Sequence, residues 1–398
     1  MKDREQPRRM LLKISTAVMI SIVGPASAWS VAQESGLMLY ILAYMTSKHI
    51  SSYVASRSTQ IAIFSYRHAP LLLVFSGLLS LLPGKLLTFA VVMPFLLGCY
   101  EGAYWAVYFD YKPWFNKASK KEGFFLSEIQ IGISRPSSEL LHNARLTSVP
   151  FAICQFVLTN SMRFVALERG VLWLAVLVVV AELASYLIVI FYRKVTQRSS
   201  SLEKIQASLW IWGQVIVLIG IALMVVGHSI ELFTLFLIGW LISQGSARGC
   251  LRKIEIQWSQ NHLSGKELES IKNPDLERFQ RNEVIAAVLG VAVATWLDLQ
   301  NELTLNPGLL GGFFALFAFI LRFPKFNFKF KQVQDGLEIG LRERLKFQSH
   351  FLTTIVFILP ALYLSVKSLV LLLLLFGFSM SIVAVIWGED SRASPLKN

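Results

Sequence analysis

The chain has 398 residues, of which 54% are apolar, and its mean hydropathy is positive, so a soluble globular protein is excluded and a membrane protein is predicted. The net charge of +13 would suit a nucleic-acid-binding protein, but no segment is long and polar enough to form a water-exposed basic patch. We therefore expect a lipid bilayer, and no nucleic acid, as a partner.

Cys99, Cys154 and Cys250 lie in or beside apolar runs, so neither a disulfide framework nor a zinc site follows.

The amino-terminal segment has two interpretations. Residues 1–13 are basic, the following residues are apolar, and Ala26-Ser27-Ala28 resembles a signal-peptidase site. We prefer a retained first helix to a cleaved signal peptide, because the next segment is also apolar and the chain stays apolar to its end. Both alternatives leave the amino terminus inside, so the later orientation is the same.

Apolar windows long enough to span a bilayer recur along the whole chain. They predict an all-α polytopic protein with about 12 transmembrane helices, at 11–29, 35–56, 69–84, 86–109, 138–162, 170–192, 206–228, 231–249, 281–299, 305–323, 350–367 and 369–388.

The distribution of basic residues supports an even number of spans. If both termini are cytoplasmic, 34 of the 38 Lys and Arg residues lie in cytoplasmic segments or in the cytoplasmic half of a span, and only Lys85, Arg163, Arg169 and Lys367 fall on the other side. A missed or invented helix would reverse every later loop and remove this asymmetry. The short polar stretch 193–205 is the predicted linker between an N-terminal six-helix bundle, 1–192, and a C-terminal six-helix bundle, 206–398.

Enzyme motifs are absent from the sequence, which has no H-E-x-x-H, Walker loop, G-x-S-x-G or G-x-G-x-x-G pattern. The six histidines fall near predicted helix ends or in loops, and we expect no cluster of them at one depth. The sequence therefore predicts that the chain is not an enzyme and has no cofactor or metal site.

One carboxylate, Glu101, lies within the fourth apolar window. At helical spacing Glu101, Tyr104, Trp105 and Tyr108 share one face. Arg145 in the fifth helix is predicted to lie at the same depth, roughly 12 Å from the cytoplasmic helix ends, and is the predicted partner of Glu101.

Two interpretations of this face are open. In the structural one, the aromatic side chains belong to the interfacial belt and Arg145 neutralises Glu101 for packing. In the functional one, Glu101 carries a proton and the aromatic rings hold a cationic or aromatic solute.

Further polar residues lie within predicted spans: Gln155, Glu182, Gln214 and Gln244. Glu182 is a candidate second relay or interhelical hydrogen-bonding group, and Gln214 is a candidate solute contact from the other half.

Glycine patterns predict close helix packing in the second half of the chain. Gly245-x-x-x-Gly249 ends the eighth helix, and Gly308, Gly311 and Gly312 begin the tenth.

Twelve helices, both ends inside and a central cytoplasmic linker resemble the major facilitator superfamily. The family's loop signature, G-x-x-x-D-[RK]-x-G-[RK], is not kept: residues 57–68 have Arg67 but no Asp, and residues 245–253 keep glycines and basic residues without the acid. The resemblance implies two six-helix bundles around a central cavity, lined in part by the Glu101 face. It implies a secondary transporter of a small organic solute working by alternating access, with Glu101 as proton or cation site.

Two other functions are alternatives: a lipid or polysaccharide flippase, and a transporter-like scaffold or sensor that does not transport. The chain has no N-x-S/T glycosylation site, which favours a bacterial source, so we expect a bacterial inner membrane. We also expect a monomer.

Overall fold

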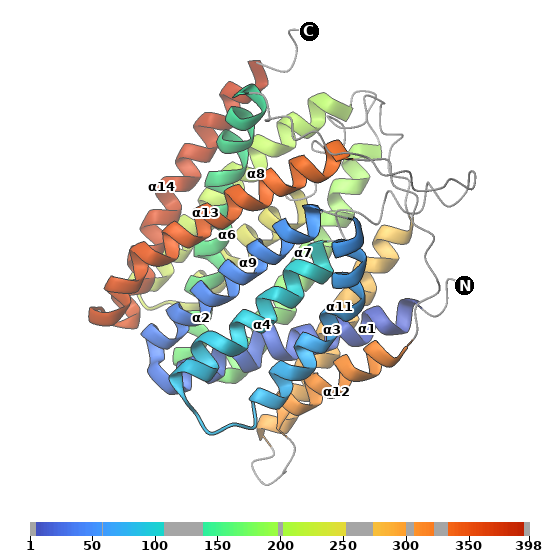
Figure 1. The fold of residues 1–398 in the computed structure, drawn as a ribbon. Helices are drawn as coiled ribbons and strands as arrows, with labels where there is room; N and C mark the ends of the chain where they lie inside the picture. The colour runs from blue at the N-terminus through green and yellow to red at the C-terminus, as the bar shows by residue number, and fades with distance from the viewer. Residues whose placement is uncertain are drawn as a thin grey trace, which may run out of the picture. The chain divides into compact units, whose positions relative to one another are not determined.

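The structure is a computed structural model, and it describes residues 5–57, 59–106, 138–197, 202–251, 274–299, 306–321 and 333–393. These residues form helices joined by short turns, with no strand among them (Figure 1). The predicted all-α class is therefore confirmed for the described chain.

The helices in chain order are α1 (Glu5–Val18), α2 (Gly24–Arg57), α3 (Thr59–Leu79), α4 (Met93–Tyr100), α6 (Ser138–Arg169), α7 (Val171–Gln197), α8 (Leu202–Ser229), α9 (Phe233–Gln244), α11 (Pro274–Leu299), α12 (Pro307–Ile320), α13 (Val333–Tyr363) and α14 (Val366–Ala393). Short π-helical segments extend or join some of them: η2 (Met19–Val23), η3 (Thr88–Val92), η4 (Glu101–Ala106) and η5 (Gly245–Leu251).

The first two predicted windows meet at a sharp break inside α2. Ala32 and Gln33 have non-helical backbone angles, and Gln33 has a φ of 44°. The two arms then lie so close that a side chain at Gly36 would overlap the Ala28 carbonyl. The break falls between windows 11–29 and 35–56, where the sequence places a connection.

Several stretches expected as loops are partly helical. Helix α3 begins at Thr59, so most of the region compared with the family loop signature is helix. The expected linker 193–205 is shorter, because α7 ends at Gln197 and α8 begins at Leu202. Helix α13 begins at Val333, inside the expected loop after the tenth span. Hydropathy marks only the apolar part of a helix, so polar turns that extend it were missed.

Six helices in the described chain are long and apolar enough to cross a membrane: Pro7–Ala55, Val149–Arg169, Val171–Tyr192, Ser208–Ser229, Arg344–Tyr363 and Val366–Trp387. The first includes the break in α2 and covers two predicted windows. Four further apolar helices are shorter: Arg67–Leu79, Thr88–Tyr104, Val284–Val293 and Pro307–Ile320. The architecture is that of a multi-pass membrane protein.

The chain divides into two compact units, each built from two separate stretches. The first unit comprises 1–141 and 296–354, and the second comprises 142–295 and 355–398. The division into bundles 1–192 and 206–398 differs from this one and stays a prediction.

Small residues bring helices together in the first unit. Helix α12, orange in Figure 1, lies beside the blue helices α1 and α3. A side chain at Gly77 would lie 2.9 Å from the Gly312 Cα, and one at Gly311 would lie 2.7 Å from Met19 Cγ. Ser15 also donates a 2.7 Å hydrogen bond to the Gly311 carbonyl. The predicted close packing at the start of the tenth window is confirmed.

Small residues also allow close helix packing in the second unit, where η5 packs on α7. A Cβ atom at Gly249 would lie 2.7 Å from Ile188 Cβ, and one at Gly245 would lie 3.2 Å from Ile188 Cγ1. The predicted role of Gly245-x-x-x-Gly249 as a close-packing pattern is thereby confirmed.

Candidate functional site

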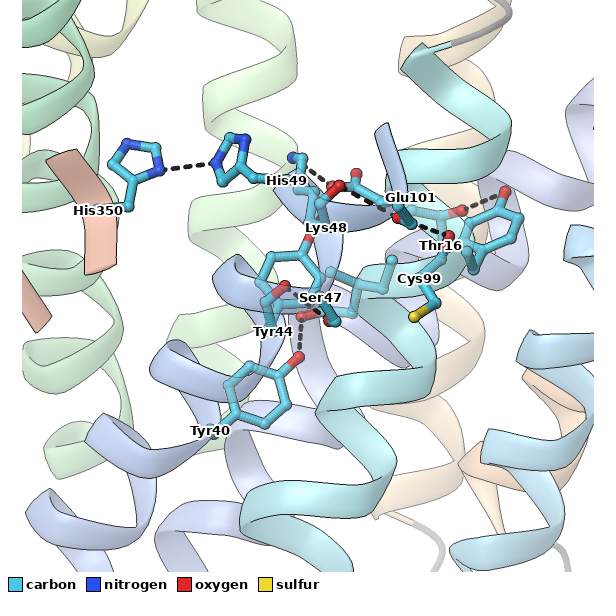
Figure 2. Close-up of polar contacts among 12 residues, drawn as sticks. Thr16, Tyr40, Tyr44, Ser47, Lys48, His49, Cys99, Glu101 and His350 are labelled. Atoms are coloured by element: carbon cyan, nitrogen blue, oxygen red, sulfur yellow. Dashed lines mark hydrogen bonds and ion pairs between the residues drawn. The ribbon is translucent and has the colours of Figure 1, made fainter. Parts of the chain in front are cut away.

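Glu101 is the first residue of η4 and lies in the apolar stretch Thr88–Tyr104. Its Oε2 atom accepts hydrogen bonds from two residues of α2, the Tyr44 hydroxyl and the Lys48 ammonium (Figure 2). The Lys48 Nζ lies 2.5 Å from this oxygen, and the two side chains are 32% and 19% exposed. The other oxygen, Oε1, accepts no hydrogen bond from the described residues. The carboxylate is therefore paired at one oxygen and open at the other.

Two glycines in α4 and η4 position this carboxylate against α2. Gly98 and Gly102 are four residues apart, with Glu101 between them. A side chain at Gly98 would overlap the Tyr44 carbonyl, and one at Gly102 would overlap the Lys48 carbonyl. Since only hydrogen atoms fit there, the backbones approach closely, and Glu101 is brought within reach of Tyr44 and Lys48.

Two pairs of stacked tyrosine rings belong to the same helices as the ion pair. Tyr40 and Tyr44 stack along α2 with their centroids 6.0 Å apart, and Tyr100 and Tyr104 stack with a separation of 5.6 Å. Thr16 of α1 donates to the Tyr100 hydroxyl at 3.1 Å. Lys13, one turn earlier on α1, adds an attractive electrostatic interaction with Glu101. The site thus draws on α1, α2, α4 and η4 of the first unit.

The predicted face around Glu101 is only partly described. Tyr104 is fully buried against Tyr100. Trp105 lies in the π-helical segment η4. The wider turn of a π-helix changes which residues share a face with Glu101, compared with the α-helical spacing assumed from the sequence. The side chains of Trp105, Tyr108 and Arg145 lie outside the described part of the chain. The pairing of Glu101 with Arg145 stays a prediction, whereas the partners that the structure shows are Lys48 and Tyr44.

Sequence analysis missed Lys48 although a usable signal was present. Lys48 lies eight residues before the end of window 35–56, so its depth is roughly 12 Å at 1.5 Å per residue. This is the same depth that was worked out for Glu101. Arg145 was predicted as the partner of Glu101, whereas the structure shows Lys48 of the second window in contact with it.

The expectation that histidines do not cluster is wrong. His49 of α2 and His350 of α13 are both buried, and His49 Nε2 lies 2.9 Å from His350 Nδ1 (Figure 2). Both residues belong to the first unit. They lie 301 positions apart in sequence, so helix-by-helix inspection could not have joined them.

In the second unit, Glu182 of α7 pairs with Arg248 of η5 at 3.6 Å. The side chains are 20% and 32% exposed, respectively, so this carboxylate is also neutralised by a neighbouring helix. The close approach of η5 to α7 at Gly245 and Gly249 places Arg248 there.

Gln214 of α8 is almost completely buried, and neither atom of its amide has a hydrogen-bond partner among the described residues. On α9, the Gln244 amide donates to the Thr159 hydroxyl of α6 at 3.4 Å. Trp210 is buried near Phe151, whereas Trp212 is mostly exposed. Gln214 and Trp210 are therefore buried, whereas Trp212 lies on an exposed face of α8.

No group of three His, Cys, Asp or Glu side chains that could hold a metal ion occurs among the described residues. Comparison of the chain with protein-family models and with curated proteins found no match. The geometry of the sites is therefore the basis for the functional proposal.

Proposed function

We propose that the chain is a secondary transporter that moves a small organic solute across a bilayer by alternating access, with Glu101 as its proton site. In this proposal twelve helical segments form two six-helix bundles like those of the major facilitator superfamily, and both termini are cytoplasmic. The single observation that carries the proposal is the Lys48–Glu101 ion pair between two apolar helices of the first unit.

Joining two apolar helices through a charged pair is unfavourable in desolvation free energy. Removing two charges from water has an effective penalty of several kcal/mol per ion, and apolar residues of similar volume often hold helices at least as well. Ionisable groups at membrane depth therefore mark ion or solute pathways more often than packing sites. The pair is also incompletely buried within the protein, since 32% of the Lys48 side chain and 19% of the Glu101 side chain are exposed.

The geometry suggests how a proton acts on this pair. Protonation at the open Oε1 removes the negative charge of Glu101, and the attraction to Lys48 is then lost. The neutral carboxyl can still accept a hydrogen bond from Tyr44. The ammonium of Lys48 becomes available to another partner, so one proton switches the site between two arrangements. A switch of this kind can couple proton entry to a change between two conformations.

The test uses purified protein in proteoliposomes that contain a pH-sensitive dye. Each solute of a panel of sugars, amino acids, carboxylates and amines is added outside, and we expect at least one to acidify the interior. Glu101→Gln should abolish this acidification, because a glutamine cannot carry the proton. Glu231→Gln is the matched control, because Glu231 also pairs with a lysine at 2.5 Å but is exposed.

Proton entry that persists in Glu101→Gln would show that another group carries the proton. If no solute moves, and Glu101→Gln only lowers stability, the scaffold alternative is favoured. Movement of a labelled lipid between leaflets, in place of soluble solutes, would identify a flippase.

A further inference from the structure

We infer that the solute bound at the Glu101 site is an organic carboxylate, which takes the place of the Glu101 carboxylate on Lys48 while Glu101 accepts a proton. This inference rests on the proposed function, because it names the class of solute for the same site. It differs from the cationic solute that is one of the two classes, cationic or aromatic, considered from the sequence.

The first argument is that the structure already contains a carboxylate bound at this place. The Glu101 group accepts one hydrogen bond from a tyrosine hydroxyl and one from an ammonium, and both bonds meet the same oxygen. These donors bind a carboxylate whichever molecule carries it, because charge-assisted hydrogen bonds of this type depend on the carboxylate group. The side chain of Glu101 thus serves as the stand-in for the solute.

The second argument is the charge around the site. Among the described side chains of the first unit, the carboxylates are Glu34 and Glu101. Glu34 precedes Lys48 by 14 residues on α2, which is about 21 Å along the helix. Lys48 contacts Glu101, and Lys13 adds a weaker attractive electrostatic interaction, so the net charge of these three groups is positive. A cationic solute would meet repulsion there, whereas an anion would be attracted.

The third argument is that the exchange keeps the charge of the site constant. A solute carboxylate brings one negative charge to Lys48, and the proton on Glu101 removes one. The number of charges within the apolar helices is therefore the same before and after binding. Without the proton, two carboxylates would share the site, and their mutual repulsion would weaken binding.

This exchange makes solute affinity depend on pH. One proton is taken up for each solute bound, so the apparent Kd should rise about tenfold per pH unit wherever Glu101 is ionised before binding and protonated afterwards. A glutamine at position 101 imitates the protonated state and leaves Lys48 without its carboxylate. Glu101→Gln should therefore bind carboxylates more tightly than the wild type, with no dependence on pH.

The experiment is isothermal titration calorimetry of the purified protein in detergent. The carboxylate probes are acetate, lactate, succinate and benzoate, and the matched controls are benzamide, benzylamine and phenyl phosphate. Titrations in buffers of different ionisation enthalpy count the protons taken up on binding. We expect binding of at least one carboxylate with about one proton in the wild type, about none in Glu101→Gln, and no binding in Lys48→Met. Lys367→Met, which changes the exposed pair, should bind as the wild type does.

The inference is overturned if none of the carboxylates binds, if benzylamine or phenyl phosphate binds more tightly than benzoate, or if binding takes up no proton in the wild type. The wild-type titrations decide this even if a variant fails to fold. Binding in detergent does not require transport, so the two proposals can fail separately. Carboxylate binding without movement in proteoliposomes would contradict only the transport proposal, and proton-coupled movement of a sugar or amine would contradict only the solute class.

Discussion

Two lysine–glutamate pairs in this chain have the same separation but different surroundings. Lys48–Glu101 and Lys367–Glu231 both measure 2.5 Å from Nζ to the carboxylate oxygen. The first pair lies between apolar helices and is 32% and 19% exposed, whereas the second is 54% and 74% exposed. Exposed pairs contribute little because water screens them, so the two pairs should respond differently to the loss of the lysine.

The Lys48→Met variant should be destabilised, because Glu101 then loses its counter-ion and one charge-assisted hydrogen bond in a mostly apolar environment. We expect a loss of about 1.5–3 kcal/mol, the usual value for a hydrogen bond to a charged group. This is less than for a fully buried pair, since both side chains are partly exposed. The measurement is the free energy of unfolding in detergent, with Lys367→Met as control. An equal effect of the two variants would show that Lys48 is as well screened as Lys367.

Glu231 provides a pH-dependent test outside the spans. Its hydrogen bond from Lys367 and the charge of Lys367 hold the pKa of this carboxyl below its ordinary value of 4.5. Because the pKa is lowered in the folded protein, the stabilisation is present above the ordinary value and is lost as pH falls through the lowered one. The melting temperature of the wild type should therefore exceed that of Glu231→Gln at about pH 7, and the difference should shrink towards about pH 3. A difference that is constant over this range would contradict the assignment.

Among the helices, the position of Glu101 depends on how closely α4 and η4 approach α2. Gly102→Ala adds a methyl group where the Lys48 carbonyl lies, so the two backbones must separate. We expect a destabilisation of about 1–3 kcal/mol, as for other overpacked sites. Proton coupling should weaken as well, because the Lys48–Glu101 distance increases.

Gly84→Ala is the control for this variant. An added methyl group there would lie 3.7 Å from Val31 and 3.8 Å from Phe89, which are ordinary contacts. Its effect should stay within about 0.5 kcal/mol, as measured by thermal unfolding in the same detergent. If Gly102→Ala is as stable as Gly84→Ala, close packing does not position Glu101.

Sequence reasoning predicted the helices better than their partners, and the Glu101 site shows why. Apolar windows locate helices because hydropathy is a local property, and helix forms most of the described part of each window. The contact of Glu101 with Lys48 joins residues 53 positions apart, and it depends on which helices pack together. The π-helical turn that begins at Glu101 also leaves no pattern in hydropathy. The apolar environment of Glu101 could therefore be predicted, but hydropathy alone could not show which helix supplies a partner for it.

At the scale of the whole molecule, length and charge give independent information about membrane crossing. Helix Pro307–Ile320 has 14 residues, about 21 Å, which is shorter than the hydrocarbon core of about 30 Å. Length alone therefore does not settle whether this helix crosses. The position of the basic residues does not depend on helix length, so it provides a separate argument for twelve crossings.

This argument predicts which positions face the outside. In a variant whose three native cysteines are replaced by serine, a single cysteine at Lys85 or Lys367 should react with a membrane-impermeant thiol reagent applied to right-side-out vesicles. A cysteine at Ser200 should react only after the vesicles are opened, because residues 193–205 are the predicted cytoplasmic linker. Lys85 tests the crossings before the linker, and Lys367 tests those after it. Labelling of Ser200→Cys from the outside would overturn the orientation. Labelling of Lys85→Cys but not Lys367→Cys would instead show an odd number of crossings between Lys85 and Lys367, so that one helix of the second half, such as Pro307–Ile320, does not cross.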